Sequence, residues 1–428
     1  MKQISDDQVR YNTTVNLLDG AFFGAALGFA SFVTIIPLFV SEFTDSAILI
    51  GLIPAIHAVG WQLPQLLTAR RVSRLEQYRP AVLVFTIHER LPFLGLAIVA
   101  WFSPSLGAQN ALILTFIILI WQGLGGGFTA NAWQSMIAKI IPSDRIGTFF
   151  GLQSSIANLL ASISAIVAGI ILARLATPTD FTTCFLLASF SMVISLFFLS
   201  RTREARSSLP QLEGKNDAFW KNIGIILKRD GNFRWFLVTR MFSQLATMGF
   251  AFYTVYAVRI LEINVATIGL MTGLLMGIQI AANPIMGWFG DRRGHRIILI
   301  FGTLAAIASA SLAFTVQGMA GFLVVFILAG IANVASWTTP MAMTLEFGRR
   351  DSDRPAYIGL ANTIVAPFTF LAPLIGGWLA DQRGFQAAFL ASAVAGLITL
   401  AILFFTVQDP PRYFETELSL TEIDFIGE

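Results

Sequence analysis

Stretches of about 20 predominantly apolar residues, the length that spans a bilayer as an α-helix, recur along this chain from end to end. A helix suits such a stretch because it satisfies all of its backbone hydrogen bonds internally. The chain is 55% hydrophobic and only 12% charged, whereas a soluble domain is about 25% charged. We therefore expect an all-α, multi-pass integral membrane protein. The apolar runs predict twelve transmembrane helices, at residues 15–41, 47–69, 80–102, 110–138, 147–175, 181–200, 234–258, 265–289, 295–317, 320–346, 356–380 and 385–407.

The distribution of Lys and Arg between the loops predicts the orientation. If both termini share one side of the membrane, that side carries 23 of the 28 Lys and Arg, and the opposite side carries only Arg174, Arg259 and Arg383. Loops rich in Lys and Arg stay in the cytoplasm. We therefore expect both termini to be cytoplasmic and the membrane to be a bacterial cytoplasmic membrane. The same bias explains the net charge of +3 better than nucleic-acid binding does.

The longest polar stretch begins at residue 201 and divides the chain into two halves of six helices. The predicted parts are an N-terminal bundle (1–200), a cytoplasmic linker with an amphipathic helix (201–233), a C-terminal bundle (234–408) and a cytoplasmic tail (409–428). The halves resemble each other, because SDRIGTFFGL from Ser143 and SDRPAYIGL from Ser352 both open a fifth helix. A duplicated six-helix unit is typical of a transporter whose site lies between the repeats.

The sequence GWFGDRRGHR connects the eighth and ninth predicted helices. Glycine at its start permits close helix packing, and a second glycine permits a backbone turn that other residues resist. With twelve helices and a long central loop, the chain resembles the major facilitator superfamily. The residues that match its loop motif G-x-x-x-D-R-x-G-x-R are Gly287, Asp291, Arg292, Gly294 and Arg296.

This resemblance implies two pseudo-symmetric six-helix bundles, the major facilitator fold. It also implies that the motif forms a conformational latch, which closes the cytoplasmic side when the protein faces outward. Asp291 can pair with a neighbouring arginine or with a helix N-terminus. The corresponding loop of the first half differs, since Leu67 replaces the glycine and Arg71 stands near the position of the acid. We therefore expect the two halves to latch asymmetrically.

Ionisable residues inside the predicted spans are functional candidates, because burying a charge in a membrane is costly. Asp19 in helix 1 and Arg240 in helix 7 lie at corresponding positions of the repeat, so one hypothesis is a gating ion pair between the halves. The alternative is that each side chain extends to the nearby membrane surface. Arg90 in helix 3 is a second candidate partner for Asp19. Glu89 is a candidate for proton coupling, with a buried structural network as the other interpretation.

The resemblance further implies that helices 1, 4, 7 and 10 line a central cavity. Polar and aromatic residues on these helices are the candidate substrate contacts, although Trp also favours membrane interfaces. Because they carry little fixed charge, they favour a neutral or amphipathic organic solute. The candidate cavity residues are Trp121, Gln122, Thr129, Gln244, Asn333 and Trp337.

The sequence contains no pattern that indicates catalysis. Cys184 is the single cysteine, the three histidines are far apart, and no nucleotide-binding loop or nucleophile motif is present. We therefore expect no enzyme activity, no catalytic residue, no metal and no cofactor. The predicted function is a monomeric secondary active transporter of a small molecule, working by alternating access, with proton coupling left open. The alternatives are a non-transporting receptor or scaffold on the same fold and a lipid-handling protein.

Overall fold

The computed structural model describes residues 5–207, 216–262, 265–316, 318–348 and 350–410. Within these ranges the chain is helical and no strand is assigned. The helices of the first half are α1 (Asp6–Phe29), α2 (Ile35–Ser41), α3 (Ala47–Gln62), α4 (Gln65–Val72), α5 (Arg79–Phe85), α6 (Ile87–Leu106), α7 (Ala108–Ile140), η1 (Ser143–Arg145), α8 (Ile146–Arg174) and α9 (Thr179–Ser200).

The second half follows a connecting helix, α10 (Asn216–Arg229). Its helices are α11 (Gly231–Ala246), α12 (Phe250–Arg259), α13 (Val265–Arg293), α14 (His295–Thr315), α15 (Met319–Phe347), α16 (Arg354–Thr363), α17 (Ala366–Arg383) and α18 (Phe385–Phe405). Eight helical segments of the described chain are long and apolar enough to cross a membrane. Every predicted span coincides with one helix or with two consecutive helices.

Five of the predicted spans are broken into two helices, which the apolar runs did not reveal. The break between α3 and α4 falls at Leu63 and Pro64, since proline has no N–H to donate and disfavours the helix before it. The break between α16 and α17 falls at Ile364 and Val365, just before Pro367. These two breaks belong to helices 2 and 11, which meet between the halves.

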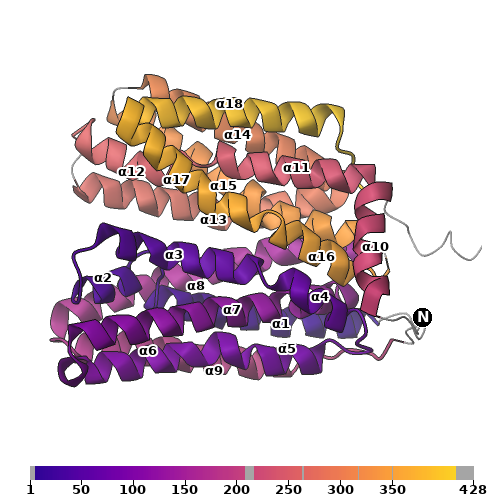
Figure 1. Ribbon diagram of the computed structural model, residues 1–428, viewed down its shortest axis with the longest axis horizontal. Coiled ribbons are helices and arrows are strands. Elements are labelled where there is room, and N and C mark those ends of the chain that lie inside the picture. The colour runs from indigo at the N-terminus through magenta and orange to yellow at the C-terminus, as the bar shows by residue number, and fades with distance from the viewer. Residues whose placement is uncertain (1–4, 208–215, 263–264, 317, 349, 411–428) are drawn as a thin grey trace, which may run out of the picture.

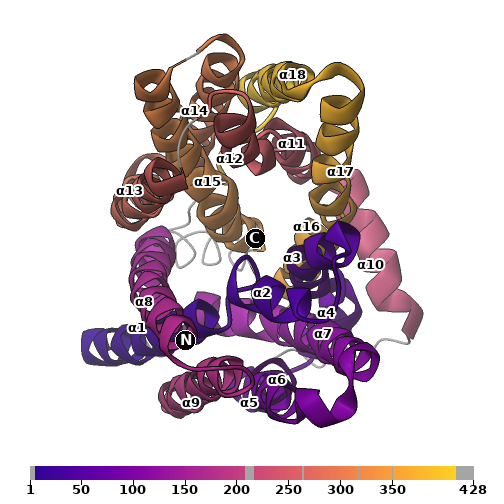
Figure 2. The same cartoon turned by 90° about the vertical axis from the view of Figure 1, so that its left-hand side faces the viewer.

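Each half forms a bundle, and Figure 1 shows the first half below the second. In the first half α1 packs on α8 and α9, and α7 packs on α3 and α6. In the second half α14 packs on α15 and α18, and α11 packs on α18. The bundles meet along two seams, α8 with α13 and α4 with α16, and Figure 2 shows these seams on opposite sides of the molecule.

One end of the molecule carries α10, the start of α1 and the end of α18 (Figure 1). We call it the linker end. The two halves converge there and their ribbons diverge toward the opposite end (Figure 1). The helix α10 is amphipathic: Ile223 and Ile226 are buried in one cluster with Phe233 and Leu403, whereas Lys228 is exposed.

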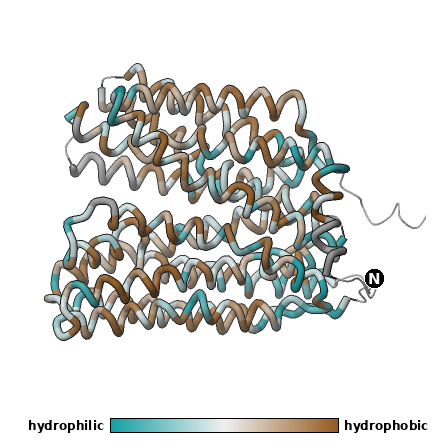
Figure 3. Tube along the Cα trace, in the orientation of Figure 1, coloured by the Kyte–Doolittle hydropathy of each residue, from teal (hydrophilic) through white to brown (hydrophobic). Residues whose placement is uncertain are grey.

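Apolar residues cover the outer surface between the two ends. Figure 3 shows hydrophobic residues along the lengths of the helices and hydrophilic residues mainly toward the two ends. Large apolar side chains such as Phe405 (80% exposed) and Phe190 (63% exposed) point outward. A surface of this kind is suited to lipid tails, since a soluble protein rarely exposes large contiguous apolar patches.

Candidate functional site

The carboxylate of Asp291 connects the two halves at the linker end. Its Oδ1 accepts the backbone N–H of Gly147 at 2.7 Å, and its Oδ2 accepts the backbone N–H of Thr148 at 2.6 Å. Both amides belong to the first turn of α8, where backbone N–H groups have no partner within the helix. A carboxylate at this position also interacts favourably with the helix dipole. We call this contact the latch. It joins the motif of the second half to α8 of the first half.

Glycine lets the backbones at the latch approach closely. A Cβ atom placed on Gly287 would lie 2.1 Å from the carbonyl oxygen of Gly147, which is far inside van der Waals contact. Gly294 has a φ of 100°, a conformation that glycine adopts without steric penalty. This turn separates α13 from α14 and places Asp291 at the end of one helix and His295 at the start of the next.

Two arginines of the motif contact groups other than the latch. The Arg292 guanidinium lies over the ring of Trp288, 4.1 Å from its centroid. Arg296 donates to the carbonyl oxygens of Leu403 and Phe404 at 3.0 and 2.7 Å, so its charge stabilises the C-terminal end of α18. Of the two arrangements open to Asp291, the hydrogen bonds of its carboxylate are those to a helix N-terminus.

His295 stands where the resemblance has Arg or Lys, and it lies between two acids. Its Nε2 is 3.8 Å from Oδ1 of Asp291 and 3.4 Å from Oε1 of Glu346 in α15. All three side chains are almost completely buried. When it carries a proton, the imidazole therefore connects the latch electrostatically to α15.

A second set of contacts joins the halves at the seam of α4 and α16. Asn362 donates to Oε1 of Gln65 at 2.7 Å, and Gln134 donates to the same oxygen at 3.3 Å. Asn131 donates to the backbone oxygens of Gln65 at 3.0 Å and Pro355 at 2.9 Å. These neutral groups meet at Gln65, about one and a half turns before Arg71, the residue near the position that corresponds to Asp291. The seam of α4 and α16 is thus joined through neutral amides, whereas the seam of α8 and α13 is joined through a carboxylate.

Thr363 of the second half completes the broken helix 2 of the first half. Its Oγ1 accepts the backbone N–H of Leu66 at 3.1 Å and lies 3.0 Å from the backbone oxygen of Leu63 and 3.4 Å from that of Gln62. These groups flank Pro64, where the regular helical hydrogen bonds are interrupted. One hydroxyl therefore satisfies helix 2 only while the halves are together. We call Gln65, Asn131, Gln134, Asn362 and Thr363 the amide gate.

Tyr78 extends the closed contact to the surface of the linker end. Its hydroxyl donates to the backbone oxygen of Asp351 at 3.1 Å. Burial raises the pKa of the Tyr78 hydroxyl, and the nearby Asp351 carboxylate adds to the rise. The hydroxyl is therefore protonated at neutral pH and remains a donor.

Asp19 pairs inside the first half and not across the halves. Nη2 of Arg90 lies 2.9 Å from Oδ1 of Asp19, and Oγ of Ser195 donates to the same oxygen at 2.5 Å. Glu89 is held less closely, with Oε2 at 3.7 Å from Nη1 of Arg90 and 3.3 Å from Oγ1 of Thr86. The pair joins α1, α6 and α9. In this conformation the cation that pairs with Asp19 is Arg90 of α6, the second candidate partner, and not Arg240.

Arg240 forms no ion pair with an acid in the described part of the chain. Its Nη1 donates to the backbone oxygen of Ala361 at 2.8 Å, and both Nη atoms lie 3.3 Å from Oδ1 of Asn362. It therefore orients the asparagine that reaches Gln65. It also lines a cavity of about 10 Å³ inside the second half, the space of about one water, with Thr239, Ser243, Gln244, Leu299, Thr303, Ala335, Ser336, Pro340, Thr399 and Leu403.

The candidate cavity residues of helix 4 face other helices of the first half. Trp121 is 37% exposed and donates from Nε1 to Nδ1 of His88 at 3.2 Å. Trp121 lies one turn before Gly125, whose backbone packs on α6. Gln122 is buried, with Oε1 2.9 Å from Nδ1 of His57 in α3. Thr129 is also buried, and its hydroxyl donates to the backbone oxygen of Gly125.

The remaining candidate cavity residues are Gln244 in α11 and Asn333 and Trp337 in α15. Oγ1 of Thr369 lies 3.3 Å from Oε1 of Gln244 and 3.1 Å from Oε1 of Gln62. Gln244 thus belongs to a cluster that joins helices 2, 7 and 11. Asn333 is half-buried on α15, and Trp337, one turn later, is 44% exposed. Within the described residues no group of three or more His, Cys, Asp or Glu is arranged to hold a metal ion.

Comparison with known proteins decides the family. The model of the major facilitator superfamily matches residues 21–259 and 236–425. The chain belongs to the major facilitator superfamily. Curated relatives share short regions with this major facilitator protein. They include a multidrug resistance protein MdtG of Dickeya zeae (28% identical over 129 residues; 30% of this chain, 31% of the relative). Another is the vesicular acetylcholine transporter of Mus musculus (26% over 133 residues; 31% and 25%). In both cases the chain spans less than a third of the relative's length.

Solved structures match over nearly the whole chain. The major facilitator transporter FucP in its outward conformation superimposes with a TM-score of 0.74 at 14% identity, covering 93% of this chain and 99% of that one. A bacterial homologue of the iron transporter ferroportin in its outward-facing state has a TM-score of 0.70 at 13% identity, with 92% and 98% covered. The predicted fold of twelve helices in two bundles is therefore confirmed, and the chain is a multi-pass membrane protein of a transporter family.

Proposed function

We propose that this protein is a secondary active transporter that moves a small neutral or amphipathic organic solute across a bacterial cytoplasmic membrane by alternating access. The observation that carries the proposal is the closure of one end by two separate inter-half contacts. The latch and the amide gate both lie at the linker end. The bonds of Asp291 to α8 and of Asn362 to Gln65 run between the halves, so both can break without unfolding a bundle.

The linker end corresponds to the cytoplasmic side in this proposal, because it carries the loops rich in Lys and Arg. The structure then represents an outward-facing state, with the cytoplasmic side sealed. The similarity to FucP in its outward conformation supports this assignment. Opening the cytoplasmic side requires Asp291 to leave the N-terminus of α8 and Thr363 to leave the break in helix 2.

The side chains available to a solute are mostly neutral. The inter-half cluster of Gln62, Gln244 and Thr369 consists of two amides and a hydroxyl, and Trp337 offers an exposed aromatic face. Amides and hydroxyls bind hydroxyl or carbonyl groups of a solute, and an aromatic ring covers its apolar part. Arg240 is engaged by Asn362 while the gate is closed.

Proton coupling is a separate part of the proposal, and Glu89 is its candidate. Asp19 is held at 2.9 and 2.5 Å by Arg90 and Ser195, whereas the contacts of Glu89 are at 3.3 and 3.7 Å. A more loosely held buried carboxyl group can take up a proton with less loss of interaction. Glu89→Gln should then abolish the dependence of uptake on a pH gradient and leave exchange of solute across the membrane intact.

The test begins with a thermal-shift screen of the purified protein against a broad panel of neutral solutes, because a ligand that binds only the folded state raises the apparent stability. Hits are then assayed for uptake into liposomes. We expect the wild-type protein to take up at least one of these solutes. Gln244→Ala should weaken this uptake mainly by raising KM. Binding without any uptake would indicate a receptor and contradict the proposal; if uptake is found, insensitivity to a pH gradient would remove only the proton-coupling part.

A further inference from the structure

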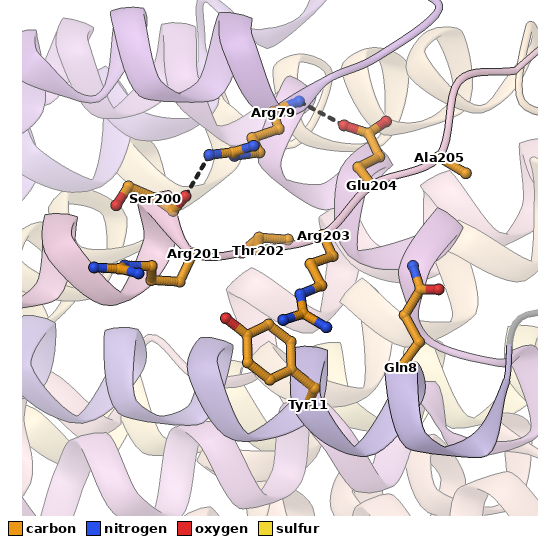
Figure 4. Close-up of a pocket in the computed structure, with 9 residues that line it drawn as sticks. All are labelled: Gln8, Tyr11, Arg79, Ser200, Arg201, Thr202, Arg203, Glu204 and Ala205. Carbon is orange, nitrogen blue, oxygen red and sulfur yellow. Dashed lines mark hydrogen bonds between the residues drawn. The ribbon is translucent and has the colours of Figure 1, made fainter.

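A basic pocket lies at the linker end of the first half, away from the latch and the amide gate. Figure 4 shows it between the start of α1 and the segment that follows α9. The pocket has a volume of about 470 Å³, within the range of small-molecule sites. It is lined by Gln8, Tyr11, Arg79, Ser200, Arg201, Thr202, Arg203, Glu204 and Ala205.

Three guanidinium groups surround this pocket, those of Arg79, Arg201 and Arg203, and none forms an ion pair with an acid of the described residues. Glu204 is the only acid of the lining, and its carboxylate is already occupied. Oε1 accepts the backbone N–H of Tyr78 and the Nζ of Lys139, both at 2.9 Å, and Oε2 accepts the backbone N–H of Arg79 at 2.7 Å. Its side chain is 1% exposed. Glu204 therefore fixes the pocket wall and leaves the positive charge of the arginine side chains uncompensated.

Local contacts hold the arginines in place. Nη2 of Arg79 donates to the backbone oxygen of Ser200, as the dashed line in Figure 4 shows. The Arg203 guanidinium lies over the Tyr11 ring, 4.0 Å from its centroid. The backbone N–H of Arg203 donates to Oδ1 of Asn12 at 2.9 Å. The pocket is thus ordered before any ligand binds, which lowers the entropic cost of binding.

The pocket lies at the depth of the lipid headgroups. Arg79 is the first residue of one apolar span and Ser200 is the last residue of another. One turn before Ser200, Phe197 is 51% exposed on the lipid-facing surface, and the Arg201 guanidinium lies over its ring at 4.8 Å from the centroid. A ligand in this pocket therefore has its charged part among the arginines and an apolar part beside Phe197.

We propose that this pocket binds the phosphate of an anionic phospholipid headgroup. Guanidinium groups bind phosphate oxygens in a bidentate manner, and basic pockets between membrane helices are suited to acidic headgroups. A phosphate here neutralises the arginines and connects α1, α5 and the start of the linker. The site is separate from the solute pathway, so its test does not depend on transport.

The probe is phosphatidylglycerol, compared with phosphatidylcholine, and the readout is lipid retained by the full chain in native mass spectrometry. Each arginine adds about 1 kcal/mol, or about five-fold in affinity, so Arg201→Gln/Arg203→Gln should reduce retained phosphatidylglycerol about 25-fold. The control is Arg145→Gln/Arg350→Gln, which removes two exposed charges from the same end and should keep the lipid.

Two results would overturn the proposal. Equal loss of phosphatidylglycerol in the control variant would mean a general attraction to the basic face and no site. Stabilisation of the wild-type protein by free glycerol 3-phosphate as strong as that by phosphatidylglycerol would mean that the ligand is a soluble phosphate and not a lipid. A thermal-stability measurement of each variant in phosphatidylcholine identifies any loss of folding. The single variant Arg201→Gln, at an exposed position, is a milder second test and should reduce retained phosphatidylglycerol about five-fold.

Discussion

Asp291→Asn should shift the protein toward states that are open at the linker end. The asparagine keeps one carbonyl oxygen for the amide of Gly147 or Thr148, but its NH2 group then faces the other amide, and two donors cannot bond. The change removes one charge-assisted hydrogen bond, worth about 1.5–3 kcal/mol, and a helix-dipole interaction, worth about 0.3–1 kcal/mol. A loss of about 2–4 kcal/mol changes the ratio of closed to open molecules by about 30- to 1,000-fold.

Spin labels measure this shift directly. Cysteines at Asp144 in the first half and Arg350 in the second, both exposed at the linker end, are labelled after the buried Cys184 is replaced by alanine. Wild-type protein should give mainly the short distance and Asp291→Asn mainly the long one. Asp381→Asn, the same change at an exposed acid of α17, should match the wild type. If Asp291→Asn keeps the wild-type distance distribution, the latch does not contribute to closure.

Three further changes probe other contacts. Gly287→Ala places a methyl group against the backbone of α8 and should also open the linker end. Gly277→Ala, in the same helix but with nothing within 4 Å of the added methyl group, should have no effect. The same spin-label pair measures both variants. Asn362→Leu removes the 2.7 Å hydrogen bond to Gln65 and the acceptor of Nη2 of Arg240. At about 1–3 kcal/mol for a buried polar group without a partner, it should reduce uptake by about ten-fold (about 1.4 kcal/mol per factor of ten). Unchanged uptake would argue against the amide gate. Arg90→Gln removes the cation that pairs with the buried Asp19 carboxylate and should destabilise the first half by about 3–5 kcal/mol, which would lower the Tm. Adding Asp19→Asn should recover part of that loss. An unchanged Tm would mean that the Asp19–Arg90 pair does not stabilise the fold.

Much of the fold follows from the sequence because the bilayer imposes one dominant constraint. Twelve apolar runs predicted twelve spans, and the helices found agree with the runs to within a few residues apart from the start of α1. The breaks inside five spans were missed, since an apolar composition is the same for a straight helix and a broken one. Pro64 was visible as a cause, but the hydroxyl of Thr363 that makes the break tolerable comes from 299 positions further along the chain.

The latch was largely predictable and the amide gate was not. The spacing of Gly287, Asp291 and Gly294 is a local pattern, and local patterns survive in a sequence. The gate depends on which faces of helices 2 and 11 meet, which is a property of tertiary packing. The one available signal was the presence of amides such as Gln65 and Asn131 inside apolar spans, where unsatisfied polar groups are costly.

The surroundings of the other candidate residues depend on packing in the same way. Asp19 and Arg240 were compared because they correspond in the repeat, yet Arg90 is nearer once helix 3 packs beside helix 1. Trp121 was assigned to a cavity because it lies on helix 4, but its direction around that helix brings it to His88. The position of a span in the order of twelve predicts which helices lie near it. The rotation of the helix about its own axis decides which of those helices a given side chain contacts.

The central claim is that the linker end and the opposite end open in turn. Spin-label pairs at both ends of one protein test it most directly, with Asp144 and Arg350 at the linker end and Ala176 and Gln382, both exposed, at the other. Across the wild type, Asp291→Asn and Gly287→Ala, the fraction of molecules with a long linker-end distance should equal the fraction with a short distance at the opposite end. Distances that vary independently, or that lengthen at both ends together, would contradict alternating access.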